Sequence, residues 1–199
     1  MLYRLLVVFC IFNLSVSAQD KTKSTLSKAT VDYTQIGAPM PDLRVAIFHD
    51  TTARRETGTQ ARTVDKNTRK KMAAFQKLTL ITDSDLKSNG NLFVMMFNPN
   101  CSHCEAVATS LYENIGLFKK SKIVLLANPV MSVYIPGFLR TCRMEHQTEM
   151  YIGTDTAGFV DHVFLYKTLP QINIYNPERR LIKTYTGDVT MDSLKKYID

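Results

Sequence analysis

Apolar and polar residues along the second half of the chain alternate in blocks that have the lengths of buried strands and amphipathic helices. Leu92–Phe97 is a run of six apolar residues, which indicates a strand that is buried on both faces. Beyond it, apolar residues recur three and four positions apart from Cys104 to Phe118, which predicts a helix. Ile123–Ala127 then repeats the pattern of a buried strand.

The same criteria predict further elements on both sides of this segment. Further strands are expected at Val45–Phe48, Met150–Ile152, Ile172–Tyr175 and Leu181–Tyr185, and further helices at Ile135–Cys142, Phe159–Tyr166 and Thr190–Ile198. The last two strands have the spacing of a hairpin. Strands that alternate with helices predict an α/β fold, with a central mixed sheet flanked by helices.

The first eighteen residues have the pattern of a secretory signal peptide. Arg4 precedes an apolar run from Leu5 to Leu14, and small residues follow it up to Ala18. Because the run is shorter than the roughly 20 residues that span a bilayer, we predict cleavage after Ala18 and no stable membrane span afterwards. The chain is therefore expected to be exported, either periplasmic or secreted, with a flexible leader over 19–35 and one domain over 36–199.

Composition and charge narrow the class of protein. The chain has 199 residues, of which 45% are hydrophobic and 22% charged, which excludes a disordered or multi-pass membrane protein. The formal net charge of +7 is concentrated in Arg54–Lys71, with seven basic residues against two acidic ones. We interpret 53–77 as a basic insertion in the domain. Because it lacks interleaved aromatic residues, no nucleic acid partner is expected, whereas an acidic partner or anionic membrane surface remains open.

The motif Cys101-Ser102-His103-Cys104 follows the predicted buried strand and opens the predicted helix. Free N–H groups and the helix dipole at such a position stabilise an anion, so the first thiol ionises more easily. The spacing also allows the second thiol to attack a mixed disulfide formed by the first. The alternatives are a static disulfide or half of a zinc site, which Cys142 and His146 would complete.

Several features together resemble the thioredoxin superfamily, in particular its exported TlpA/ResA-like branch. The resemblance covers roughly residues 36–198. It rests on the segment Ile36–Asp42, the buried strand before the Cys-Ser-His-Cys motif, Leu169-Pro170 followed by Gln171–Tyr175, and Gly187 before a terminal helix. The cysteine spacing is specific only in combination with the downstream proline and hairpin, and all three occur in that order.

The resemblance implies a thioredoxin-like fold in which Cys101 is the nucleophile and Cys104 the resolving thiol, paired as a disulfide when oxidised. It also implies a cis peptide bond between Leu169 and Pro170, whose backbone would contact an extended substrate. The expected partners are protein thiols or disulfides and an upstream redox partner. No cofactor and no metal are expected, and the protein is expected to be a monomer.

This sequence departs from the family pattern at three positions. Asn100 replaces the usual tryptophan, Met95 replaces the buried acid of thioredoxins, and Val107 replaces the glutamate of ResA-like proteins. Glu105 lies one helical turn after Cys101 and is a candidate for proton transfer, although an exposed glutamate at a helix start has the same pattern.

Two further side chains carry expectations of their own. His103 is expected to stabilise the Cys101 thiolate, and so to give a redox potential between those of thioredoxin and of DsbA. Cys142 lies on the apolar stripe of its helix and is expected to be a buried free thiol.

These patterns lead to one hypothesis with one alternative. The chain is interpreted as an extracytoplasmic thiol-disulfide oxidoreductase that acts on protein substrates. The alternative is a non-enzymatic thioredoxin-fold binding module with a structural disulfide or a zinc site.

Overall fold

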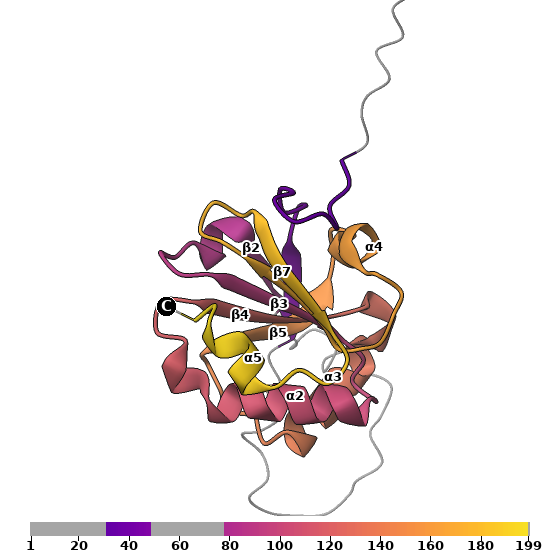
Figure 1. Ribbon diagram of the computed structural model, residues 1–199. Helices are drawn as coiled ribbons and strands as arrows, with labels where there is room; N and C mark the ends of the chain where they lie inside the picture. The colour runs from indigo at the N-terminus through magenta and orange to yellow at the C-terminus, as the bar shows by residue number, and fades with distance from the viewer. Residues whose placement is uncertain (1–30, 49–77, 199) are drawn as a thin grey trace, which may run out of the picture. The chain divides into compact units, whose positions relative to one another are not determined.

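Seven strands form one mixed sheet in the part of the chain that the structure, a computed structural model, describes: residues 31–48 and 78–198 (Figure 1). The strands are β1 (Arg44–Phe48), β2 (Leu78–Thr82), β3 (Leu92–Phe97), β4 (Lys122–Ala127), β5 (Met150–Asp155), β6 (Gln171–Tyr175) and β7 (Leu181–Thr186). Their order in the sheet is β2-β1-β5-β4-β3-β6-β7. Strands β3, β4 and β5 are parallel, and the remaining pairs are antiparallel.

Helices cover both faces of this sheet. They are α2 (Ser102–Glu113), α3 (Ile135–Thr141), α4 (Phe159–Val163) and α5 (Met191–Lys195), with shorter 3-10 turns η2 (Asp83–Leu86), η3 (Ile115–Leu117) and η4 (Pro129–Tyr134). Buried side chains of α2, α3 and α5 form one core cluster with the sheet, and those of α4 and η2 form a second. Figure 1 shows α2 and α5 on one side of the strands and α4 on the other.

Strand β3 is the part of the sheet that supports the cysteine motif. It lies between β4 and β6, and all six of its residues are buried, as the continuous apolar run predicted. Its side chains alternate between the two cores, with Phe93, Met95 and Phe97 on the α2 side and Leu92, Val94 and Met96 on the α4 side. Side chains on both faces of β3 and neighbouring strands on both edges hold it in place. The position at which the following turn begins is therefore fixed.

The predicted α/β architecture with a central mixed sheet is confirmed, while the four helices of the described part are shorter than predicted, α3 by a single residue. Helix α2 ends at Glu113, because Asn114 takes the C-cap and its amide nitrogen donates to the Ser110 carbonyl oxygen at 2.9 Å. Helix α4 ends at Val163, before Tyr166, which has φ +50°. Helix α5 ends at Lys195.

Several predictions fall on residues outside the described ranges. These are the signal peptide 1–18 with its cleavage site, the first part of the leader 19–35 and the basic insertion 53–77. Within the described ranges, no helix is both long and apolar enough to cross a membrane.

Candidate functional site

The turn between β3 and α2 places Cys101 at the amino end of the helix. Asn98 closes this turn, because its carbonyl oxygen accepts a hydrogen bond from the Cys101 N–H (3.1 Å) and its side-chain oxygen accepts one from the Asn100 N–H (2.9 Å). Cys101 is the N-cap residue of α2, and its sulfur accepts a hydrogen bond from the Cys104 N–H at 3.4 Å. A negative charge on the Cys101 sulfur therefore meets the positive end of the helix dipole.

The two thiols of the motif differ in their burial. Cys101 is half-buried, whereas Cys104 is fully buried in the core beneath α2. Burial, with a smaller contribution from the hydrogen bond to Cys101, raises the pKa of the Cys104 thiol to about 12. Of the two sulfurs, Cys101 is thus the one that another molecule can reach, and Cys104 is held as a protonated thiol at neutral pH.

Both thiols are free in the structure, so the site is described in its dithiol form. The expected Cys101–Cys104 disulfide remains a prediction for the oxidised protein.

The Leu169-Pro170 segment lies beside the carboxyl end of β3. The peptide bond between the two residues is cis, as the family resemblance implied. The next residue, Gln171, pairs with Met96 in the sheet, which places Pro170 next to the last residue of β3 and close to the start of the cysteine turn. The Pro170 carbonyl oxygen accepts a hydrogen bond from the Gly187 N–H at 2.9 Å. Gly187 has φ +79°, a conformation that favours glycine.

His103 contacts a side chain that the sequence analysis did not identify. Its Nδ1 lies 2.6 Å from Oδ1 of Asp188, which follows β7. The two side chains are 64% and 76% exposed, so the pair lies at the surface of the motif. The two residues are 85 positions apart, and nothing in the local pattern around Asp188 marks it. A carboxylate that holds one imidazole nitrogen orients the ring and leaves Nε2 free to face another group.

Glu105 lies close to the buried thiols. Its N–H donates to the Cys101 carbonyl oxygen at 3.0 Å, and its own carbonyl oxygen accepts a hydrogen bond from the Cys142 sulfur at 3.7 Å. Burial is the main cause that raises the pKa of both Cys104 and Cys142, and the negative charge of Glu105 adds to it. A role of Glu105 in proton transfer remains a prediction.

Cys142 is a buried free thiol, as predicted, but the proposed zinc shell around it is wrong. Helix α3 ends at Thr141, and Arg143 has φ +55°, so Cys142 and His146 do not share a helical face. Among residues 31–48 and 78–198, no group of three or more His, Cys, Asp or Glu side chains is arranged to hold a metal ion.

A cavity of about 240 Å³ lies beside the cysteine turn and was not predicted. Apolar side chains at the ends of β3 and β4, on α4 and in the segment between α4 and β6 line much of it, including Leu126, Phe164 and Leu169. Asn98, from the cysteine turn, and Tyr166 also line it, and Tyr166 is among the most exposed aromatic residues of the described part. The surface next to the cysteine motif on the side of Leu169 is therefore largely apolar and accessible.

Comparisons with protein-family models and with curated proteins find no match. Solved structures do match. A thiol:disulfide interchange protein from Bacteroides sp. is 13% identical with a TM-score of 0.56, over 83% of this chain and 91% of that one. A DsbF homologue from Corynebacterium diphtheriae is 15% identical with a TM-score of 0.55, over 81% and 85%. The thioredoxin domain of a thiol-disulfide oxidoreductase from Bacteroides vulgatus is 14% identical with a TM-score of 0.52, over 83% and 99%.

At these identities the likeness establishes the fold, and the chain therefore has the thioredoxin-like fold of these solved thiol-disulfide proteins, in agreement with the resemblance in its sequence.

Proposed function

We propose that this chain is an extracytoplasmic thiol-disulfide oxidoreductase that exchanges disulfides with protein substrates through Cys101 and Cys104. One observation carries the proposal: the first turn of α2 holds an accessible sulfur at its N-cap and a fully buried one three residues later. An accessible nucleophile beside a shielded resolving thiol is the arrangement that two-step disulfide exchange requires.

In the first step, the Cys101 thiolate attacks one sulfur of a substrate disulfide. The Cys101–substrate S–S bond forms as the substrate S–S bond breaks, and the other substrate sulfur leaves as a thiolate that takes up a proton. The N–H groups at the start of α2 stabilise the attacking thiolate.

In the second step, Cys104 loses its proton and attacks the Cys101 sulfur of the mixed disulfide. The Cys101–Cys104 bond forms, and the second substrate cysteine leaves as a thiol, so the substrate gains two electrons and two protons in total. The high pKa of Cys104, which burial raises to about 12, keeps this thiol protonated until the mixed disulfide is in place. The reverse sequence oxidises a substrate dithiol, and an upstream redox partner resets the pair in either direction.

The surroundings of Cys101 support a polypeptide as the substrate. Leu169 and Pro170 lie beside the cysteine turn, and the apolar cavity next to them suits a side chain near a substrate cysteine. Apart from the two thiols, His103 and Glu105 are the titratable side chains closest in sequence to the two sulfurs. We propose His103 as the group that favours the reduced state and Glu105 as the group that assists proton transfer.

Insulin reduction by dithiothreitol tests the proposal. The wild-type protein is expected to accelerate it, and Cys101→Ser is expected to abolish the acceleration. Cys142→Ala is the matched control, because it removes a buried thiol that lies outside the motif. In Cys104→Ser, a stable mixed disulfide with the substrate should accumulate and can be isolated on a non-reducing gel. Unchanged activity in Cys101→Ser contradicts the proposal.

The alternative is a non-enzymatic binding module in which the cysteine pair is structural. It is favoured by Met95, because an apolar side chain stands where thioredoxins have a buried acid. A disulfide that closes a loop of only four residues is expected to contribute about 2 kcal/mol to stability, because the contribution grows with loop length. If reduction of the wild-type protein lowers the free energy of unfolding by that amount and insulin reduction is absent, the alternative holds.

Export is part of the same proposal. We expect the mature chain to begin after Ala18 in an extracytoplasmic fraction, which N-terminal sequencing of the exported protein measures. A mature chain in that fraction that still begins at Met1 contradicts the signal peptide.

A further inference from the structure

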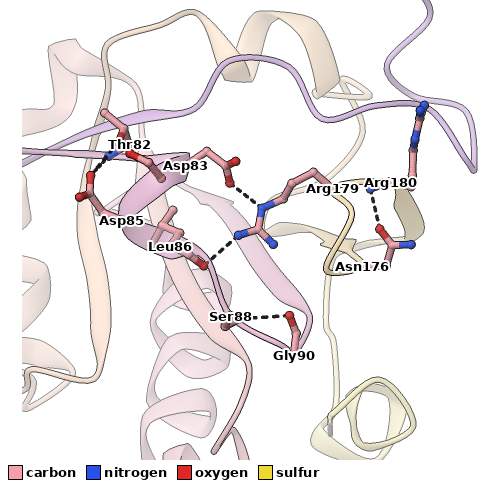
Figure 2. Close-up of polar contacts among 10 residues, drawn as sticks. Thr82, Asp83, Asp85, Leu86, Ser88, Gly90, Asn176, Arg179 and Arg180 are labelled. Carbon is pink, nitrogen blue, oxygen red and sulfur yellow. Dashed lines mark hydrogen bonds and ion pairs between the residues drawn. The ribbon is translucent and has the colours of Figure 1, made fainter.

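A second cavity, of about 510 Å³, lies at the other end of β3, where the strand begins. The segment 83–89 forms one side of it, and the turn of the β6–β7 hairpin forms the other. These two segments are brought together by Arg179, whose side chain reaches from the hairpin turn to the segment before β3 (Figure 2). The cavity is therefore built by a long-range polar contact and not by a surface loop alone.

Arg179 is held firmly by two of its three guanidinium nitrogens. Its Nε donates to Oδ1 of Asp83 at 2.5 Å, and its Nη2 donates to the Leu86 carbonyl oxygen at 2.8 Å. The side chain is 13% exposed. The backbone of Arg179 has φ +59°, a conformation that glycine or asparagine adopts at lower cost than arginine. The hydrogen bonds of the Arg179 side chain offset part of this backbone cost.

The third nitrogen, Nη1, has no acceptor. It is buried, and no oxygen or nitrogen of the described residues accepts its hydrogen bonds. In Figure 2 it points away from both Asp83 and the Leu86 carbonyl group. A buried donor that is left unpaired is costly, so native structures pair nearly all such groups with protein, water or ligand.

A second cation stands at the same cavity. Lys87 lines it, is exposed, and forms no ion pair with the described residues. The two carboxylates at the cavity are those of Asp83, which Arg179 already pairs, and of the exposed Glu178. With two cations and two carboxylates around the cavity, a singly charged anion is tolerated better than a phosphate dianion.

We propose that this cavity binds a carboxylate. One carboxylate oxygen faces the guanidinium group of Arg179, whose Nη1 lacks an acceptor, and the other pairs with the ammonium group of Lys87. Planar carboxylates fit the guanidinium group well, because its N–H donors lie in one plane. The ligand is a free carboxylic acid or an acidic residue of a polypeptide, which share this chemistry.

The proposed binding site is separate from the cysteine motif. The segment 83–89 precedes the first residue of β3, whereas Cys101 follows the last one. Six residues of extended strand span about 20 Å, so a carboxylate in this cavity does not touch the two sulfurs. The proposal therefore holds or fails independently of the proposed redox function.

Titration of the ¹⁵N-labelled protein with acetate, followed by NMR, tests the proposal. We expect the side-chain Nε–H resonance of Arg179 to shift in a saturable manner. Arg179→Lys is expected to weaken acetate binding by about tenfold, because it keeps the charge and loses the planar donors. Arg180→Lys is the matched control. In Figure 2 its side chain points away from Arg179, Asp83 and Leu86, and it does not line the cavity.

Lys87→Gln tests the proposal even if the Arg179 variant does not fold. Lys87 is exposed, and its substitution leaves the Arg179 contacts in place. It is expected to weaken acetate binding by a smaller factor. A titration with a short glutamate-containing peptide distinguishes the two sources: tighter binding than acetate assigns the site to a polypeptide, and equal binding to a free acid. The proposal is overturned if acetate gives no saturable shift, if inorganic phosphate binds more tightly than acetate, or if Arg180→Lys weakens binding as much as Arg179→Lys.

Discussion

The two ends of β3 use polar groups in opposite ways. At the carboxyl end, Cys101 is accessible, and the His103–Asp188 pair lies at the surface. At the amino end, the guanidinium group of Arg179 is mostly buried and bonded to Asp83 and to the Leu86 carbonyl oxygen. One buried strand thus supports the end at which we propose the disulfide chemistry, called the reactive end below, and an end held by hydrogen bonds, called the bonded end. Substitutions at the first should change chemistry with little effect on stability, and substitutions at the second should do the reverse.

The difference follows from the solvent around each group. An ion pair in water contributes about 0–1 kcal/mol, because water screens both charges. The same contact in a half-buried setting is costly to break, since the partner that remains has lost its solvation. The Arg179 contacts therefore fix the fold, whereas the surface groups beside Cys101 can adjust the reaction.

The largest expected effect is at the reactive end. Cys101→Ser removes the nucleophile, so insulin reduction is expected to fall to the uncatalysed rate. Its free energy of unfolding in the reduced state should stay within about 0.5 kcal/mol of wild type, because the residue is only half-buried. Urea denaturation measures the free energy of unfolding. A decrease of several kcal/mol in Cys101→Ser would contradict the proposed difference between the two ends of β3.

At the bonded end, Asp83→Ala is expected to lower the free energy of unfolding by about 2 kcal/mol and to leave insulin reduction unchanged. It removes the acceptor of Arg179 Nε and leaves a buried cation without its partner. The control is Asp42→Ala, which breaks the exposed Asp42–Arg44 pair and should cost less than about 0.5 kcal/mol. Equal losses in both variants would contradict the argument from burial.

The pH dependence of stability sharpens the comparison between the two sulfurs. Burial raises the pKa of Cys104 from 9.0 to about 12, so an unfolded chain ionises this thiol before the native protein does. The stability that the protonated thiol contributes is complete below pH 9 and is lost as the pH rises from 9 towards 12.

The matched variant is Cys104→Ala in the reduced state. The urea midpoint is measured at about pH 8 and at about pH 10.5. Its decrease between these two pH values should be larger in wild type than in Cys104→Ala. Burial also raises the pKa of Tyr175, to about 12, but that contribution is common to both proteins and cancels in the comparison. Parallel losses in the two proteins would show that Cys104 is not the group that titrates.

The smallest effect concerns the surface pair. His103→Ala is expected to make the protein more reducing, with a change of about two- to fivefold in the equilibrium constant with glutathione. Asp188→Asn should shift the constant in the same direction but by less, because it loosens the imidazole without removing it. In the double variant the Asp188 substitution should add nothing further, whereas additive shifts would show that the two side chains act separately.

Local patterns were sufficient to predict the reactive end. The continuous apolar run of β3 and the spacing of Cys101 and Cys104 are short-range features, and the structure places both where the sequence predicted them. The cis bond before Pro170 came from the family resemblance and is confirmed. The mixed sheet was also predicted, because alternation of strands and helices has few solutions.

Local sequence patterns did not predict contacts between residues that are far apart in the sequence. Asp188 meets His103 across 85 positions, and Asp83 meets Arg179 across 96, without any local periodicity to link them. The zinc hypothesis failed for a local reason: a left-handed residue, Arg143, follows the end of α3, and helical spacing no longer holds beyond it.

The position of β3 between two neighbours also bears on how the protein fluctuates. An interior strand that is covered on both faces opens only with the whole structure, so its amide hydrogens exchange slowly with solvent. The edge strands β2 and β7 have a free side within the described sheet and can open locally. Such openings leave the strand before Cys101 in place. The more frequent motions at the edges therefore do not change the distance between the Cys101 and Cys104 sulfurs.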